Sequence, residues 1–386
     1  MPDKFSKLSE KKKWEIADKL SPKLTVENWE RYAVAAEMNA KLIARKENDV
    51  EQSLSVVRGA VEQKSLIALI QAIAKDYPKD DELKAIIGEL QNGYLDKLER
   101  LTKMIASDQC ILFLGPGVLK INGSENIFND ALSEILRNKL EKATIYFDPT
   151  QQDNLAYIVQ RFYKIPKTFP GQAGHEAANL YKSYFDSGRI NDSVFDKLSN
   201  VPWKLVINAN PDDILSKMME KQNPGSVLRR KYTISNNIDE RTLTQQVIND
   251  MNDVKENKKS FFYNLFGTFE EQHSILYTEA DFLEFINSVV NKAPALHSQV
   301  TSAFDDKKHY LFLGFDFDQW YFKILVKTLK LYNKEERALS LTGGLKRFSE
   351  SNLDFFEQEY KFFFVEDDID PFLTQLVRYY EKETGK

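Results

Sequence analysis

Short apolar runs alternate with amphipathic, helix-like stretches from about residue 108 onward, and this order constrains the fold more than any other feature. Each strand-like run ends in a polar or glycine-containing turn, and the runs lie at residues 109–114, 203–208, 260–266 and 309–315. Parallel strands are buried by helices on both faces, so they read as apolar runs between helical segments. We therefore predict an α/β domain with a parallel sheet over residues 96–386. Ligands of such sheets bind beyond the carboxyl ends of the strands, so chemistry is expected in the four turns.

The first hundred residues lack such runs, and we predict an all-α bundle over residues 1–95. One apolar stripe has the i, i+3, i+4, i+7 spacing of a helix face: Leu66, Leu69, Ile70 and Ile73. Pro78 ends this helix, and a polar turn and Leu83 follow. That succession resembles the last helices of bacterial death-like, or effector-associated, adaptor domains. The resemblance implies a protein partner bound through the helical domain, and a helical bundle without that role is the alternative.

Composition narrows the cellular setting. The net charge of −5 over 386 residues carries no direct signal for nucleic-acid binding. Cys110 is the only cysteine, so neither a disulfide framework nor a cysteine metal site can form within the chain. The sequence has no apolar run of membrane-spanning length, and its lysine-rich start is not followed by a signal-peptide core. We expect a cytoplasmic protein that does not enter a membrane.

Each turn contains candidate binding residues that also have a purely structural interpretation. Gly115 and Gly117 follow the first strand and could let a pyrophosphate approach the backbone, but the proline between them has no N–H to donate. Asn210 and Asp212 follow the second strand, where an aspartate is also a common helix cap.

Taken in order, the turns resemble the motifs of the SIR2-like family. Members carry Gly-Ala-Gly-x-Ser after the first strand, Thr-Thr-Asn-x-Asp after another, then Leu-His-Gly, and Gly-x-Ser-Phe-x-Asp near the end. This chain has Gly-Pro-Gly-Val-Leu at 115–119, Asn-Ala-Asn-Pro-Asp at 208–212, Leu-Phe-Gly at 265–267 and Gly-Phe-Asp-Phe-Asp at 314–318. The resemblance covers about residues 108–380 and implies a Rossmann-like sheet with NAD as cofactor.

The resemblance assigns roles only to positions that match. It implies that Gly115, Gly117 and Gly314 bind the cofactor, and that Asn210 and Asp212 both bind NAD and act in catalysis. In active relatives that asparagine lies against the ribose and nicotinamide side of NAD, where an amide can donate to and accept from sugar hydroxyls. Asp318 is taken as the counterpart of the aspartate that ends the last motif, although the family places that aspartate one residue further on, and a helix start is its structural alternative.

The chain departs from the family pattern at several positions, and three of these departures bear most directly on binding and cleavage of NAD. Pro116 and Leu119 stand where relatives have alanine and serine, so an N–H and a hydroxyl that could face a pyrophosphate are missing. Phe266 stands where relatives have the histidine that serves as general base or hydrogen-bond partner. A phenyl ring cannot move a proton, and such groups contribute roughly 10²–10⁴ in rate. His273 is the nearest histidine in sequence but lies in a polar run typical of a surface turn, and the other three have no motif context: His175, His297 and His309.

We therefore predict a degenerate SIR2-like protein, a pseudoenzyme that acts as an NAD-related nucleotide-binding, scaffold or regulatory component. The resemblance suggests a bacterial antiviral defence setting. The alternative is an active NAD glycohydrolase that depletes NAD through Asn210 and Asp212. Protein deacetylation is a distant third alternative, because the four-cysteine zinc module of deacetylases cannot be built with Cys110 alone. A homo-oligomer and a ligand such as ADP-ribose stay open as alternatives.

Overall fold

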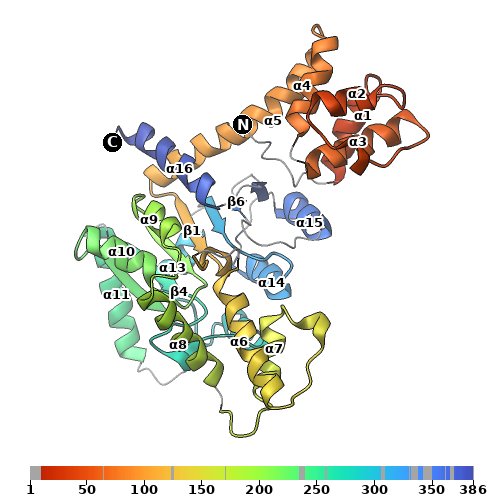
Figure 1. Cartoon of the computed structure of the whole chain (residues 1–386). Coiled ribbons are helices and arrows are strands. Elements are labelled where there is room, and N and C mark those ends of the chain that lie inside the picture. Colours follow the sequence, from red (N-terminus) through yellow and green to blue (C-terminus); the bar gives the residue numbers. More distant parts are fainter. Residues whose placement is uncertain are drawn as a thin grey trace.

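The described residues form an all-α bundle and a parallel α/β domain, joined by one long helix (Figure 1). The computed structural model describes residues 10–63, 65–122, 126–169, 171–233, 240–256, 259–305, 309–329, 331, 338–341, 350–360, 362–365 and 369–385.

The N-terminal bundle has a hydrophobic core of its own. Its elements are α1 (Glu10–Leu20), α2 (Trp29–Ala35), η1 (Ala40–Leu42), α3 (Asp49–Glu62), α4 (Leu66–Asp76) and the first part of α5 (Asp81–Ala106). The apolar stripe predicted from the sequence is confirmed, since its four members lie on α4 and are fully buried. The helix ends two residues before Pro78, because the residue preceding a proline disfavours helical backbone.

Helix α5 connects the bundle to the sheet, and position 95 lies inside it. Leu83, Ile86 and Leu90 in its first part pack into the bundle core. Leu98 and Leu101 in its second part pack instead into the core of the α/β domain. The change from one core to the other therefore occurs between residues 90 and 98, within a continuous helix (Figure 1).

The α/β domain contains a seven-stranded, wholly parallel sheet in the order β3-β4-β2-β1-β5-β6-β7. The strands are β1 (Cys110–Leu114), β2 (Leu205–Asn208), β3 (Val227–Lys231), β4 (Ser260–Asn264), β5 (His309–Leu313), β6 (Ala338–Leu341) and β7 (Phe362–Val365). The predicted fold class is confirmed. The four predicted runs are β1, β2, β4 and β5, the four adjacent strands at the centre of the sheet.

Residues along each central strand alternate between two cores, one on each face of the sheet. In β1, for example, Leu112 and Leu114 belong to one core, and Ile111 and Phe113 to the other. The first core is covered by α6 (Phe128–Lys142), α7 (Leu155–Phe162), α8 (Gln172–Asp186), α9 (Ser193–Ser199), α10 (Ile214–Gln222) and α16 (Ile369–Thr384). The second is covered by α11 (Glu240–Glu256), α12 (Glu279–Asn291), α13 (Ser298–Asp305), α14 (Trp320–Thr328) and α15 (Glu350–Tyr360).

Strand β1 marks the point where the order of the strands reverses. The chain continues from β1 to β2 on one side, whereas β5 pairs with β1 on the other. In open parallel sheets the crevice at such a switch point is the usual ligand site. The loops after β1, β2 and β5 therefore meet where a cofactor is expected.

Candidate functional site

The backbone N–H groups of the loop after β1 donate hydrogen bonds to carbonyls of the protein itself. Pro116 to Val118 form a short 3-10 turn, η2 (Pro116–Val118). The amides of Gly115 and Gly117 donate to the carbonyls of Leu313 and Gly314, both at 2.8 Å. The next two amides donate to carbonyls within the loop, that of Val118 at 3.2 Å and that of Leu119 at 3.3 Å. Since Pro116 has no N–H, residues 115–119 have no backbone donor left for a phosphate.

The glycines of this loop are explained by a close approach to the loop after β5. A Cβ on Gly115 would lie 2.6 Å from the carbonyl oxygen of Gly314. Gly314 has φ +70°, and a Cβ there would lie 2.6 Å from the amide nitrogen of Val118. Leu119, at the position of the family's serine, is buried in the first core. The glycine pattern therefore serves packing of backbone against backbone.

The loop after β2 is held by side-chain amides. Asn208 accepts from the amide of Asn210 and donates to the carbonyl of Asp212. Asn264, at the end of β4, also donates to the carbonyl of Asn210 at 3.0 Å. The side-chain amide of Asn210 donates to the carbonyl of Gly115 at 2.9 Å. One N–H of the Asn210 side chain therefore links the loop after β2 to the loop after β1.

Phe266 is packed among aromatic rings. It is 6% exposed, and its ring stands edge-on to Phe282 at 5.2 Å, to Phe285 at 5.3 Å and to Tyr321 at 6.0 Å between centroids. Phe282 and Tyr321 are themselves stacked at 4.1 Å. Gly267 follows with φ +89°, and a Cβ there would clash with Ser274. Phe266 is therefore a core side chain.

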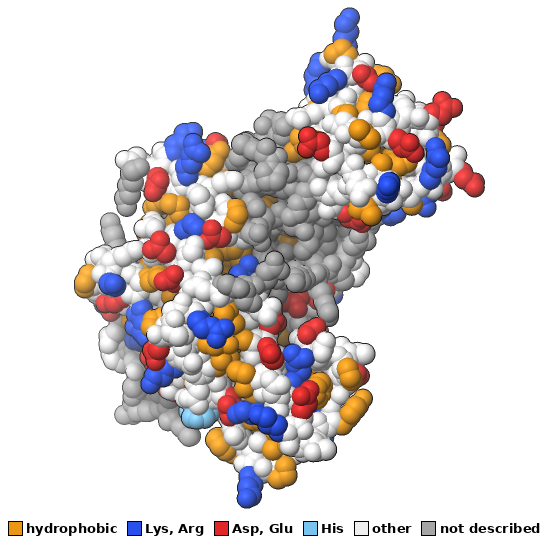
Figure 2. Space-filling view, in the orientation of Figure 1, with side chains coloured by type: hydrophobic (Ala, Val, Ile, Leu, Met, Phe, Trp, Pro, Cys, Tyr) orange, Lys and Arg blue, Asp and Glu red, His pale blue; other side chains and the backbone are white. Residues whose placement is uncertain are grey.

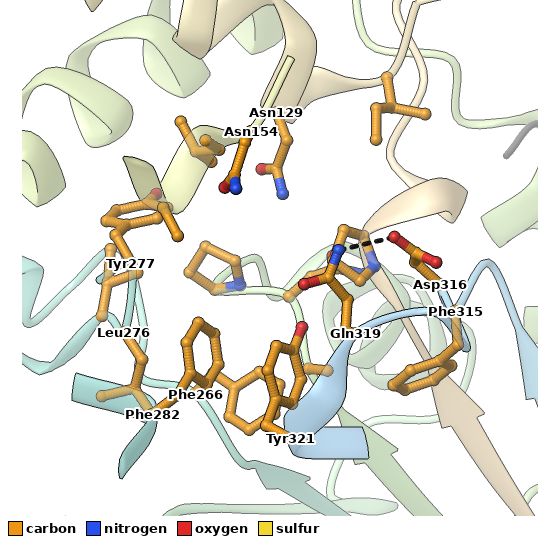
Figure 3. A pocket seen from close by; sticks show the side chains of 18 of the residues that line it. Asn129, Asn154, Phe266, Leu276, Tyr277, Phe282, Phe315, Asp316, Gln319 and Tyr321 are labelled. Atoms are coloured by element: carbon orange, nitrogen blue, oxygen red, sulfur yellow. Dashed lines mark hydrogen bonds between the residues drawn. The ribbon is translucent and has the colours of Figure 1, made fainter. Parts of the chain in front are cut away.

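A small cavity lies at the switch point, with a volume of about 230 Å³, and we call it the switch-point cavity. Asn210, Phe266 and Gly314 line it, whereas Gly115, Gly117 and Asp212 do not. Figure 3 shows the aromatic rings of Phe266 and Tyr321 on one side of it and the amides of Asn129 and Asn154 on the other. The volume lies below the roughly 300–1,000 Å³ of most small-molecule sites.

The described walls of the switch-point cavity carry negative charge only. Four acidic residues line it, and no described lining residue is a lysine or arginine: Asp130, Asp153, Glu279 and Asp316. Burial raises the pKa of the Asp316 carboxyl, although Gln319 and the amide of Asp318 donate hydrogen bonds to it. Carboxylates in a cavity wall repel phosphates. The residues present therefore do not fit a dinucleotide with a pyrophosphate.

None of the four histidines, all of them described, lines the switch-point cavity. His175 and His273 are exposed, and His309 begins β5 at the opposite ends of the strands. Nε2 of His297 lies 2.9 Å from Asp250, and its Nδ1 accepts from the amide of Gln299. Burial lowers the pKa of His297 despite the neighbouring carboxylate. Both of its ring nitrogens are thus engaged within the protein, away from the switch-point cavity.

Asp212 faces a different cavity, on the other side of the loop after β2. It is 2% exposed, and burial raises the pKa of its carboxyl to about 7. Oδ1 accepts from the amide of Ile214, at the start of α10, whereas Oδ2 has no hydrogen-bond partner among the described residues. Asn210 therefore lines the switch-point cavity, whereas Asp212 lines a second cavity.

The second cavity has a volume of about 1,420 Å³, and we call it the basic cavity. Six cationic residues line it: Lys182, Lys217, Arg229, Arg230, Lys231 and Lys292. Sequence reasoning missed this site because its cations come from several distant segments. The run Arg229-Arg230-Lys231 in β3 was the one local signal.

Residues 204–358 match the model of the SIR2-like domain family. The match includes Asn210, Asp212, Phe266 and Gly314 but starts after β1 and its glycine loop. Together with the sheet topology, it shows that the chain contains a Rossmann-like SIR2-like domain, preceded by a helical region. A search of curated proteins found no match.

The described residues contain neither a membrane-spanning helix nor a cluster of metal ligands. None of their helices combines the length and the apolar character needed to cross a membrane. No group of three or more histidine, cysteine, aspartate or glutamate side chains among them is arranged to hold a metal ion.

Proposed function

We propose that the SIR2-like domain of this protein does not cleave NAD and serves as a scaffold or regulatory component. The observation that carries the proposal is the packing of Phe266 against Phe282, Phe285 and Tyr321 at the position of the family's histidine. NAD cleavage in the family draws on that histidine, and the cavity beside Phe266 has no other histidine in its wall. A side chain that cannot accept or donate a proton removes this contribution entirely.

The surroundings of Phe266 support the same conclusion. The backbone donors of residues 115–119 are used within the protein, so the loop cannot cradle a pyrophosphate as it does in dinucleotide-binding folds. The switch-point cavity is small and lined by carboxylates. NAD therefore meets neither the hydrogen-bond donors nor the positive charge that its two phosphates require.

The bundle at the N-terminus is proposed to recruit the protein to a helical domain of a partner, in a bacterial antiviral defence setting. The resemblance to death-like adaptor domains supports this role, and the separate core of the bundle is consistent with it. On the face shown in Figure 2, charged side chains of both signs surround apolar ones on the bundle. Val34 and Leu42 are 68% and 69% exposed and provide apolar contacts for a partner.

The purified protein is expected to release no nicotinamide from NAD and to bind no NAD in the switch-point cavity. Calorimetry measures binding, and chromatography of the reaction mixture measures nicotinamide. Asn210→Ala, which also removes the hydrogen bond to Gly115, is the matched variant. Nicotinamide release that is lost in Asn210→Ala would overturn the proposal in favour of an NAD glycohydrolase. NAD binding that is weakened in Asn210→Ala, without nicotinamide release, would point to a nucleotide-binding pseudoenzyme that uses the switch-point cavity.

A fragment of residues 1–95 is expected to fold by itself. It retains the residues of the bundle core, including Leu83, Ile86 and Leu90 of α5, and ends before the first residue of α5 that packs into the sheet domain. Circular dichroism should show helix that is lost in one cooperative urea transition. A fragment without a cooperative transition would show that the bundle depends on the α/β domain.

A further inference from the structure

The basic cavity lies where the sheet presents the carboxyl ends of β3 and β4. Lys231 ends β3 and Asn264 ends β4, and both line the cavity. Asp212, in the loop after the adjacent β2, lines it as well. Ligands of parallel sheets bind at this edge. The cavity therefore combines a suitable position with a volume of about 1,420 Å³, which is ample for a ligand of nucleotide size.

Positive charge exceeds negative charge in the described walls of this cavity. Lys217 pairs with Asp213 at 2.7 Å, Arg230 pairs with Asp250 at 2.5 Å, and Lys231 pairs with Glu271. Arg229 donates to the hydroxyl of Ser216 at 2.8 Å and has no ion pair with a described acid.

Lys182 and Lys292 are exposed and likewise have no ion pair with a described residue. Three cations in the wall thus have no described carboxylate as a partner. Among the described acids that line the cavity, Glu270 is the one that is both exposed and outside an ion pair.

Two further features of the wall suit the rest of a nucleotide. Tyr181 and Phe269 both line the cavity and are stacked at 4.4 Å between ring centroids, which provides an aromatic platform. Oδ2 of Asp212 is buried in the same wall without a hydrogen-bond partner among the described residues. Burial raises the pKa of this carboxyl to about 7, which reduces the negative charge that it adds to the wall near neutral pH.

We propose that the basic cavity binds a nucleoside phosphate, with its phosphates on Lys182, Arg229 and Lys292 and its base against Tyr181 and Phe269. This site is distinct from the switch-point cavity, because the loop of Asn210 and Asp212 separates the two. The inference does not depend on whether NAD is cleaved. It gives the protein a place to sense a phosphorylated small molecule that the acidic switch-point cavity excludes.

Calorimetry with ADP on the full-length protein tests the proposal, with adenosine and inorganic phosphate as partial ligands. ADP is expected to bind more tightly than either part, and raised salt should weaken its binding. The double variant Lys182→Gln/Lys292→Gln should bind ADP about tenfold or more weakly, because both cations would contact the phosphates. Both lysines are exposed, so the fold should tolerate these changes.

The control is Lys142→Gln/Lys221→Gln, which neutralises two exposed lysines that line neither cavity. It should leave ADP affinity unchanged. Absence of ADP binding to the unaltered protein would overturn the proposal, as would equal affinity in both double variants. Binding of a single-stranded oligonucleotide without binding of ADP would likewise contradict it and point to a polynucleotide surface.

Discussion

Phe266→His is expected to release no nicotinamide from NAD and to lower the free energy of unfolding by about 2–4 kcal/mol. The restored imidazole would lie among the rings of Phe282, Phe285 and Tyr321, in a cavity lined by acids and without phosphate donors. Loss of apolar contacts and burial of a polar ring both destabilise the fold. Urea denaturation measures stability, and chromatography measures nicotinamide.

Phe169→His is the matched control, because Phe169 is 55% exposed. The same substitution there should change stability by less than about 0.5 kcal/mol. Nicotinamide release by Phe266→His would contradict the proposal that the whole site has lost its chemistry. Unchanged stability would show that the aromatic cluster does not depend on Phe266.

Asp212→Asn is expected to stabilise the protein at alkaline pH. The pKa of this carboxyl is raised from 3.8 to about 7 by burial, so the folded state favours the protonated form. For an acid with a raised pKa, the unaltered protein loses stability as pH rises from the unfolded pKa toward the folded one. Asparagine cannot ionise and can still accept from the amide of Ile214 as Oδ1 does now.

The difference between the two proteins should therefore grow with pH. It is expected to be under about 1 kcal/mol at pH 4 and at most about 4 kcal/mol at pH 8. Urea denaturation across this range measures it. Asp213→Asn is the control, since Asp213 forms a partly exposed ion pair with Lys217, and its effect should stay within about 1 kcal/mol. A pH-independent difference for Asp212→Asn would contradict the raised pKa.

The centre of the sheet could be predicted from the sequence, whereas its edges could not. Strands β1, β2, β4 and β5 are buried on both faces, and therefore appear as plain apolar runs. Strand β3 has the sequence Val-Leu-Arg-Arg-Lys and lies at an edge, where charged side chains reach water and protect the strand from pairing with other chains. Because of these charged residues, β3 is not an apolar run and was not predicted as a strand. Strands β6 and β7, at the other end of the sheet, were not predicted either.

The candidate site was predicted in part. The order of the motifs pointed to Asn210, Phe266 and Gly314, which the structure places around one cavity. The same order grouped Asp212 with Asn210, although their side chains line opposite sides of the loop. Residues two apart in a turn can point in opposite directions, because the backbone dihedral angles between them, and not the spacing, decide where each side chain goes.

The sequence alone determined the parallel α/β core, the helical region before it and the presence of phenylalanine at position 266, because burial pattern and residue identity are local properties of the chain. Only the tertiary structure decided what surrounds that position. The carboxylates of the switch-point cavity and the cations of the basic cavity come from segments far apart in sequence, and the amides after β1 bond to a loop some 200 residues later. Charge and hydrogen-bond capacity in a cavity are sums over such neighbours, so they exist only once the chain has folded.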